Sequence, residues 1–151
     1  MPRAAIFGVA GPVLAPDEAA FLREADPWGA ILFGRNVEAP DQLRRLTGDI
    51  REALGRDAPI LTDQEGGRVA RLGAPHWRSW PSVAEDAARG AGALHLRYRL
   101  IAAELRDVGI DVDCMPLLDL PVAGAHDGIG DRAFGPDPEV AATCGRVVCA
   151  A

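Results

Sequence analysis

The stretch AILFGRNVEAPDQLRRLTGDIREALGRDAPILT, residues 30–62, decides the fold. It begins with the apolar run Ala30–Phe33 and ends with a second short apolar run, Ile60–Thr62. Between the two runs, Pro40 is typical of a first helical turn, and apolar residues then recur at spacings of three and four, which places them on one helix face. These residues are Leu43, Leu46, Ile50 and Leu54. Gly55 suits the end of this helix. The stretch predicts a strand, a helix and a second strand.

The same alternation continues on both sides of this stretch. Further apolar runs cover residues 5–9 and 110–115, and helical patterns cover residues 17–25, 82 or 83 to 108, and 137 to Ala151. Short strands that alternate with helices are typical of parallel βαβ units. The sequence therefore predicts an α/β fold, either an open doubly wound sheet or a barrel of eight such units.

Composition limits the classes of protein and partner. A chain of 151 residues with 48% hydrophobic and 25% charged residues is typical of one globular domain. A net charge of −6 without a basic run predicts no nucleic-acid partner and no membrane partner. No signal-peptide core and no apolar stretch of about 18 residues is present, so we expect a cytoplasmic protein. Three cysteines without metal-binding spacing, Cys114, Cys144 and Cys149, predict buried reduced thiols.

Polar residues follow the predicted strands, which is where barrel enzymes build their sites. They lie at residues 35–36, 63–68 and 119–132. No G-x-G-x-x-G or Walker sequence follows any strand, so nucleotide binding loses its main support. Asp63 ends the third predicted strand, Gly66 and Gly67 allow a sharp turn, and Arg68 and Arg71 can anchor carboxylates. A glycine turn with solvated charges explains the same residues, and composition alone leaves both interpretations open.

An acid-rich run invites a metal-site hypothesis. Its members are Asp111, Asp113, Asp119, Asp127 and Asp131. The first two alternate with apolar residues and so share one face of a strand, which does not establish the convergent oxygens that a hard cation needs. We therefore expect these acids to pair with arginines or to cap helices, and we expect no metal and no other cofactor.

Four segments carry a family resemblance. In chain order they are GAILFGRNVEAPDQLRRLTGDIR, DQEGGRVARL, DVDCMPLLDLPV and GIGDRAFGPDPE. Together they resemble the family 3 glycoside hydrolases, in particular the bacterial β-N-acetylglucosaminidase branch that acts in peptidoglycan recycling. The resemblance covers essentially all 151 residues. It implies the N-terminal half of a (β/α)8 barrel, with about four βα units, as one partial catalytic domain over residues 1–151.

The resemblance also implies a substrate and a set of binding residues. The substrate is the terminal N-acetylglucosamine of a muropeptide or related glycan. The aspartate of the family's D-x-E-G-G-R motif, here Asp63, binds hydroxyls of that sugar. The second arginine of the motif matches Arg71, and the arginine of the G-[DE]-R segment matches Arg132. Each of the two could hold a sugar oxygen or orient Asp63. Trp77 and Trp80 are candidates for a surface that stacks on the sugar, whereas Trp28 is expected to pack in the core.

The family cleaves by a retaining route, with an aspartate nucleophile and, in this branch, a histidine assisted by an aspartate as the acid/base. The K-H-F-P-G-H-G segment and the nucleophile are expected beyond Ala151, so the isolated chain is predicted to be inactive. His76, His95 and His126 do not occupy that motif and are expected to be structural or solvent-facing.

Two alternatives remain open at the level of the sequence. The chain could be a non-catalytic carbohydrate-binding or assembly fragment, which keeps the sugar contacts but lacks the bond chemistry. It could carry a different family 3 specificity, such as that of a β-glucosidase. A half-barrel would also leave strand edges unpaired, which predicts self-association of the chain through those edges.

Overall fold

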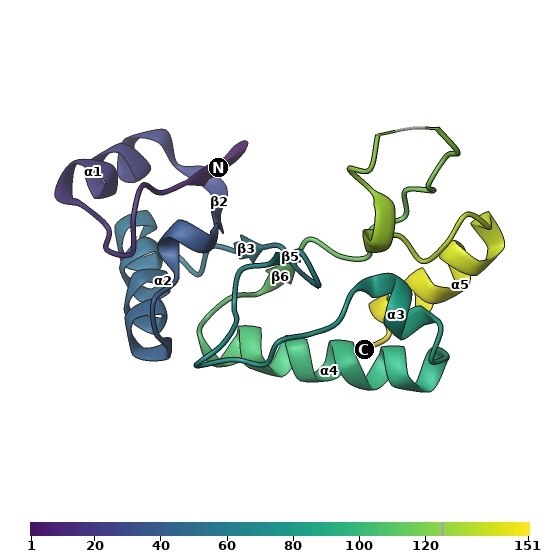
Figure 1. Ribbon diagram of the computed structural model, residues 1–151. Coiled ribbons are helices and arrows are strands. Elements are labelled where there is room, and N and C mark those ends of the chain that lie inside the picture. The colour runs from purple at the N-terminus through teal and green to yellow at the C-terminus, as the bar shows by residue number, and fades with distance from the viewer. Residues whose placement is uncertain (125) are drawn as a thin grey trace. The chain divides into compact units, whose positions relative to one another are not determined.

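The computed structural model describes residues 1–124 and 126–151. The chain divides into two compact units, which are described separately (Figure 1). The first comprises Met1–Asp63 and Glu104–Asp113, and the second comprises Gln64–Ala103 and Cys114–Ala151.

The first unit holds a four-stranded parallel sheet. Its strands are β1 (Arg3–Gly8), β2 (Pro27–Leu32), β3 (Ile60–Thr62) and β6 (Val112–Asp113), and they pair in the order β1-β2-β3-β6. Ala30 lies opposite Ile60, and Leu61 lies opposite Val112. Strands that neighbour each other in the sheet in their order along the chain are the arrangement of successive βα units in a barrel. The predicted α/β class is confirmed.

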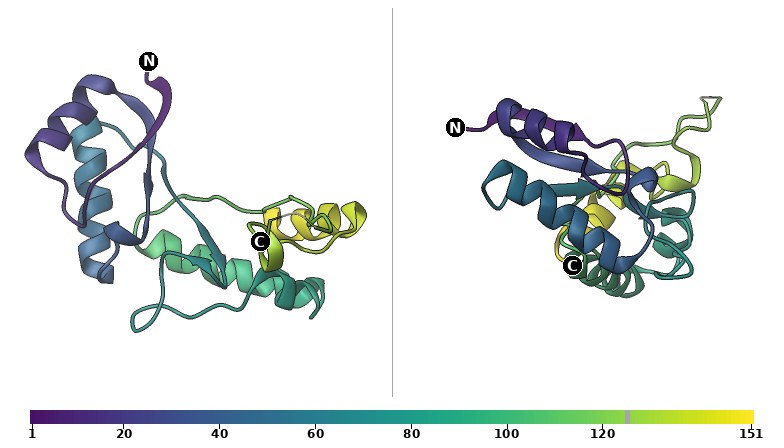
Figure 2. Two further views of the ribbon diagram at one scale, coloured as in Figure 1. Left: turned by 45° about the horizontal axis from the view of Figure 1, so that its top comes forward. Right: turned by 90° about the vertical axis from the view of Figure 1, so that its left-hand side faces the viewer.

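Two helices of this unit connect its strands. Helix α1 (Pro16–Ala25) joins β1 to β2, and α2 (Pro40–Leu54) joins β2 to β3. Figure 2 shows both helices beside the strands that they connect. Helix α2 buries the predicted face, except that Leu54 is only half-buried. Gly55, with a φ of 64°, ends α2 as predicted.

Side chains of α2 fasten the segment that leads into β6. Thr47 Oγ1 donates a hydrogen bond to Val108 O at 3.0 Å, and Arg51 Nη2 donates to Gly109 O at 2.9 Å. Arg51 also forms an ion pair with Asp111 at 2.6 Å, and the same Asp111 oxygen accepts a hydrogen bond from Ile60 N at 2.9 Å. Asp111 is therefore a structural acid, as predicted, because it links α2 to β3.

The second unit consists of a hairpin and helices. The hairpin pairs β4 (Gln64–Gly66) with β5 (Val69–Ala70) in antiparallel fashion. Helix α3 (Val83–Ala87) and α5 (Pro138–Cys149) lie in this unit, and α4 (Ala91–Asp107) runs from it into the first. The short 3-10 helices are η1 (Gly34–Asn36) in the first unit and η2 (Gly130–Arg132) in the second. Asp137 caps α5 by accepting a hydrogen bond from Glu139 N at 2.8 Å.

Two helix predictions are wrong in their bounds. The single helix predicted from residue 82 or 83 to residue 108 is two helices, α3 and α4, separated by Gly90 with a φ of 94°. That backbone conformation suits glycine and breaks the helix, while Gly109 ends the second part as predicted. Helix α5 ends at Cys149, whereas the prediction continued it through Ala151.

Two burial predictions are also wrong. Trp28 lies within β2 and is 44% exposed, because the alternation of a strand turns it away from its buried neighbours Pro27 and Gly29. Cys114 and Cys149 are exposed and Cys144 is half-buried, and none of the three forms a disulfide. Partial burial raises the pKa of the Cys144 thiol.

Residues 1–124 and 126–151 contain no helix that is both long and apolar enough to cross a membrane. They contain no group of three or more histidine, cysteine or acidic side chains placed to hold a metal ion.

Candidate functional site

The polar pair that follows β2 is structural. Asn36 is fully buried, and its Nδ2 donates hydrogen bonds to Val9 O at 3.1 Å and to Gly11 O at 2.8 Å. Arg35 Nε donates to the same Val9 O at 3.0 Å. Both side chains thus hold the loop that leaves β1, because buried carbonyl groups need hydrogen-bond donors.

Asp63 lies where the sequence predicts it. It follows Thr62 directly at the carboxyl end of β3, is half-buried, and is the last residue of its segment in the first unit. Thr62 is fully buried and donates its hydroxyl to Leu32 O at 3.0 Å, which ties the end of β3 to β2. The end of β3 therefore fixes the position of the backbone from which the Asp63 side chain extends.

The DQEGGR motif continues into the hairpin of the second unit. Gly66 and Gly67, with φ values of 94° and 56°, form the predicted turn. The buried side chain of Gln64 closes the base of the hairpin: its Oε1 accepts hydrogen bonds from Arg71 N at 2.8 Å and Leu72 N at 3.0 Å. Its Nε2 donates to Leu72 O at 2.8 Å. The backbone at Arg71 is thereby held.

Glu65 brings Arg132 onto this hairpin. Arg132 Nε lies 2.7 Å from Glu65 Oε2, and Nη2 lies 2.7 Å from Oε1, so the pair is bidentate. The Glu65 side chain is 4% exposed and the Arg132 side chain is 25% exposed. Arg132 Nη1 also donates to Gly128 O at 3.1 Å. The sequence reasoning identified Arg132 but missed Glu65, because an acid between a polar residue and a glycine carries no burial signal.

A buried arginine holds the backbone of Glu65. Arg97 is 3% exposed and forms an ion pair with the buried Asp86 at 2.5 Å. Its Nη2 donates to Glu65 O and, at 3.0 Å, to Pro81 O. The Tyr98 hydroxyl donates to Glu65 O at 3.3 Å. No pattern in the sequence had singled out Arg97.

Arg68 holds the loop that precedes Arg132. Its Nη2 donates to Asp127 O at 2.6 Å and to Ile129 O at 3.1 Å, and its Nε lies 3.0 Å from Asp131 Oδ1. Arg68 was predicted to anchor a carboxylate, and the carboxylates that it meets are those of Asp127 and Asp131. These two acids are therefore paired with an arginine, as predicted.

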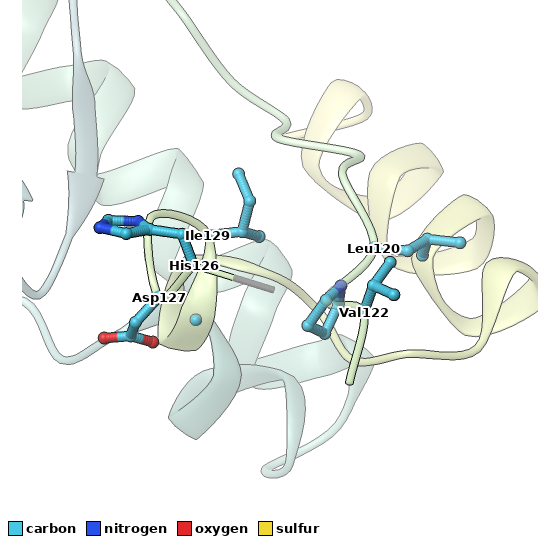
Figure 3. Close-up of a pocket in the computed structure, with 7 residues that line it drawn as sticks. Leu120, Val122, His126, Asp127 and Ile129 are labelled. Carbon is cyan, nitrogen blue, oxygen red and sulfur yellow. The ribbon is translucent and has the colours of Figure 1, made fainter. Parts of the chain in front are cut away.

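A small pocket opens beside this loop. Its volume is about 170 Å3, and Figure 3 shows the side chains that line it. The lining residues are Leu120, Pro121, Val122, His126, Asp127, Ile129 and Gly130. His126 is exposed, as is His76, whereas His95 is half-buried in α4. The two candidate tryptophans, Trp77 and Trp80, are half-buried in the loop after the hairpin, where Gly67 N donates to Trp80 O at 2.9 Å.

Comparison with known proteins gives the family. The model of the "Glycosyl hydrolase family 3 N terminal domain" matches residues 14–151. The chain belongs to glycosyl hydrolase family 3. This membership confirms the resemblance that the four sequence segments carry, and it covers both units of the structure.

Family 3 relatives and solved structures agree with this assignment. A "Beta-hexosaminidase" of Methylococcus capsulatus is 40% identical over 146 residues, which cover 93% of this chain and 42% of that protein. NagZ from Neisseria gonorrhoeae in complex with N-trifluoroacetyl-D-glucosamine matches with a TM-score of 0.87 and 29% identity, over 97% of this chain and 45% of NagZ. A family 3 β-N-acetylglucosaminidase from Paenibacillus gives a TM-score of 0.87 and 28% identity, over 96% of this chain and 28% of that enzyme.

These matches confirm two sequence predictions within family 3. The chain resembles the β-hexosaminidase branch, and its fold is that of the N-terminal half of the (β/α)8 barrel. The chain spans less than half the length of the curated relatives that it matches. The sugar-binding roles of Asp63, Arg71 and Arg132 stay predictions.

Proposed function

We propose that the protein is a β-N-acetylglucosaminidase that removes terminal, non-reducing, β-linked N-acetylglucosamine by a retaining mechanism. The observation that carries this proposal is the similarity to β-hexosaminidases at 35–40% identity over 93% of the chain. The similarity to a NagZ that binds an N-acylated glucosamine supports the same sugar class. The proposed setting is peptidoglycan recycling in the cytoplasm, with a muropeptide as the physiological substrate.

In this proposal Asp63, Arg71 and Arg132 hold the non-reducing sugar. A carboxylate at the end of β3 would accept hydrogen bonds from sugar hydroxyls, and two guanidinium groups would donate to sugar oxygens. Support comes from the local order around them: β3 fixes the backbone before Asp63, Gln64 fixes the backbone at Arg71, and Glu65 fixes the guanidinium of Arg132. Such order lowers the cost of binding, because little side-chain freedom remains to be lost.

The test is hydrolysis of a chromogenic aryl N-acetyl-β-glucosaminide by the product of the complete gene. Asp63→Ala should lower kcat/KM by about 10- to 100-fold, since a hydrogen bond to a charged group contributes about 1.5–3 kcal/mol. The matched control is Asp49→Ala, which removes an exposed aspartate from α2 and should leave kcat/KM unchanged. Cleavage of the corresponding β-glucoside in preference to the N-acetylated substrate would replace the proposal with the β-glucosidase alternative.

For the 151-residue chain alone we propose sugar binding without hydrolysis, because neither expected motif for the bond chemistry occurs in it. Release of the chromophore by the pure chain, abolished by Asp63→Ala, would contradict this.

Self-association of the chain is a further proposal, supported by the exposed residues Ile6 and Trp28 on β1 and β2. With Ala4 and Ala5 these residues line an open apolar surface within the first unit. Sedimentation that shows only monomer at every concentration would contradict this proposal.

A further inference from the structure

We infer that Glu65 is the positioning residue for Arg132, and that it acts on substrate binding through that arginine alone. The inference deepens the proposed function and rests on it, because it takes Arg132 to be a sugar-binding group. It assigns a task to the third residue of the DQEGGR motif, whose carboxylate lies within the second unit.

The geometry of the pair carries the first step. A guanidinium is a planar fork, and two parallel contacts of 2.7 Å to one carboxylate set both its position and the orientation of its plane. A single contact would leave the fork free to rotate. Arg132 lies in η2, and besides its two contacts to Glu65 its Nη1 donates to Gly128 O at 3.1 Å. That single bond to a carbonyl does not fix the plane of the fork, so the direction of the guanidinium depends on Glu65.

Burial carries the second step. The Glu65 side chain is 4% exposed and meets Arg132 with both oxygens, whereas Arg132 keeps 25% of its side chain exposed. The glutamate thus faces inward and the arginine reaches the surface of the unit. An inward carboxylate that orients an outward cation is the arrangement expected when the cation meets a ligand and the carboxylate does not.

The support behind Glu65 carries the third step. Its backbone carbonyl accepts hydrogen bonds from Arg97 and, at 3.3 Å, from the hydroxyl of Tyr98. Arg97 is itself fixed by the buried Asp86. The glutamate is therefore held at its backbone by α4 and at its side chain by Arg132, so that the position of Arg132 follows from that of the hairpin.

The test is a double-mutant cycle in the product of the complete gene, with the aryl N-acetyl-β-glucosaminide as the probe. The variants are Glu65→Gln, Arg132→Ala and the combination of the two. Glu65→Gln should lower kcat/KM by about 10- to 100-fold, mainly through a higher KM, because the displaced arginine meets the sugar poorly. The combined variant should be no worse than Arg132→Ala, because the effect of Glu65 passes through the group already removed.

Controls separate positioning from folding. Glu139→Gln removes an exposed glutamate of α5 in the same unit and should leave kcat and KM unchanged. A variant that only lowers the folded fraction would lower the apparent kcat and leave KM as it was. If Glu65→Gln does not fold, the cycle is made with Glu65→Asp, which keeps the charge but shortens the reach to Arg132, and the same coupling is expected.

The outcomes distinguish the inference from the proposed function. Losses that multiply in the combined variant, or a Glu65→Gln variant with wild-type KM, overturn the inference and leave the proposed function intact. A wild-type protein that cleaves no N-acetyl-β-glucosaminide overturns the proposed function, and the inference falls with it. A raised KM together with coupled losses supports both.

Discussion

Glu65 and Arg68 lie three residues apart on one hairpin, and both bind the segment that ends at Arg132. The Glu65–Arg132 pair is a buried contact, whereas the contacts of Arg68 with Asp127, Ile129 and Asp131 are exposed. The Glu65 side chain is 4% exposed and makes one bidentate contact. The Arg68 side chain is 42% exposed and spreads its contacts over two carbonyls and two carboxylates. Water competes for the Arg68 contacts and is kept from those of Glu65. We infer that the buried Glu65–Arg132 contact sets the orientation of the Arg132 guanidinium, while the exposed contacts of Arg68 only limit the movement of the loop.

The buried ion pair that supports the backbone of Glu65 gives the largest expected effect on stability. Asp86 forms ion pairs with two arginines, with Arg97 at 2.5 Å and with Arg89 at 3.3 Å. The Arg97 side chain is 3% exposed and the Arg89 side chain is 62% exposed. Arg97→Ala should lower the free energy of unfolding by about 3–5 kcal/mol, because it leaves a buried carboxylate without its main partner.

Arg89→Ala is the matched control, because it removes the exposed partner of the same carboxylate. It should cost less than about 1 kcal/mol. Urea unfolding followed by circular dichroism measures both variants. Equal losses of unfolding free energy would mean that burial does not distinguish the two ion pairs, and the contrast between buried and exposed contacts would fail.

The turn between Glu65 and Arg68 gives an intermediate effect on stability. Gly66 has a φ of 94°, and a Cβ there would lie 2.6 Å from Pro81 O and would also clash with the Arg97 guanidinium. Gly66→Ala should therefore cost at least about 1–3 kcal/mol from backbone strain alone. Gly48→Ala is the opposite case, because Gly48 lies in α2 with open space around it and should gain about 0.5–1 kcal/mol. Thermal unfolding checks both, and a Gly66→Ala variant as stable as the wild type would contradict the geometry.

Much of the fold could be predicted because local signals agree with it. The period of the apolar residues from Leu43 to Ile50 and the stop at Gly55 gave α2, and short apolar runs gave the four parallel strands. Gly90 misled the helix prediction, because a glycine within an apolar pattern is compatible with both a continuous helix and a break. Trp28 misled the burial prediction, because hydrophobicity does not tell which face of a strand is covered.

The candidate residues could be predicted only in part. Asp63, Arg71 and Arg132 came from the motif resemblance, which names residues but not their contacts. Glu65 and Arg97 were missed because their burial depends on pairing across 67 and 11 residues of sequence, with Arg132 and with Asp86 respectively. A charged residue is expected at the surface unless its partner is known, and no local pattern reveals such a partner.

The exposed contacts of Arg68 give the smallest expected effect on stability. Their response to salt distinguishes them most sharply from the buried contacts. Arg68→Ala should lower the free energy of unfolding by less than about 1 kcal/mol, since its ion pairs to Asp127 and Asp131 are exposed. That loss should shrink further as the Debye length falls from about 10 Å at 0.1 M salt to about 3 Å at 1 M. The loss in Arg97→Ala should persist at both salt concentrations, because solvent ions do not reach a buried pair. Urea titrations of both variants at the two concentrations measure this difference. If salt weakened both losses alike, the two sets of contacts would be equally exposed to solvent. Burial would then give no reason to assign the position of Arg132 to Glu65 and not to Arg68.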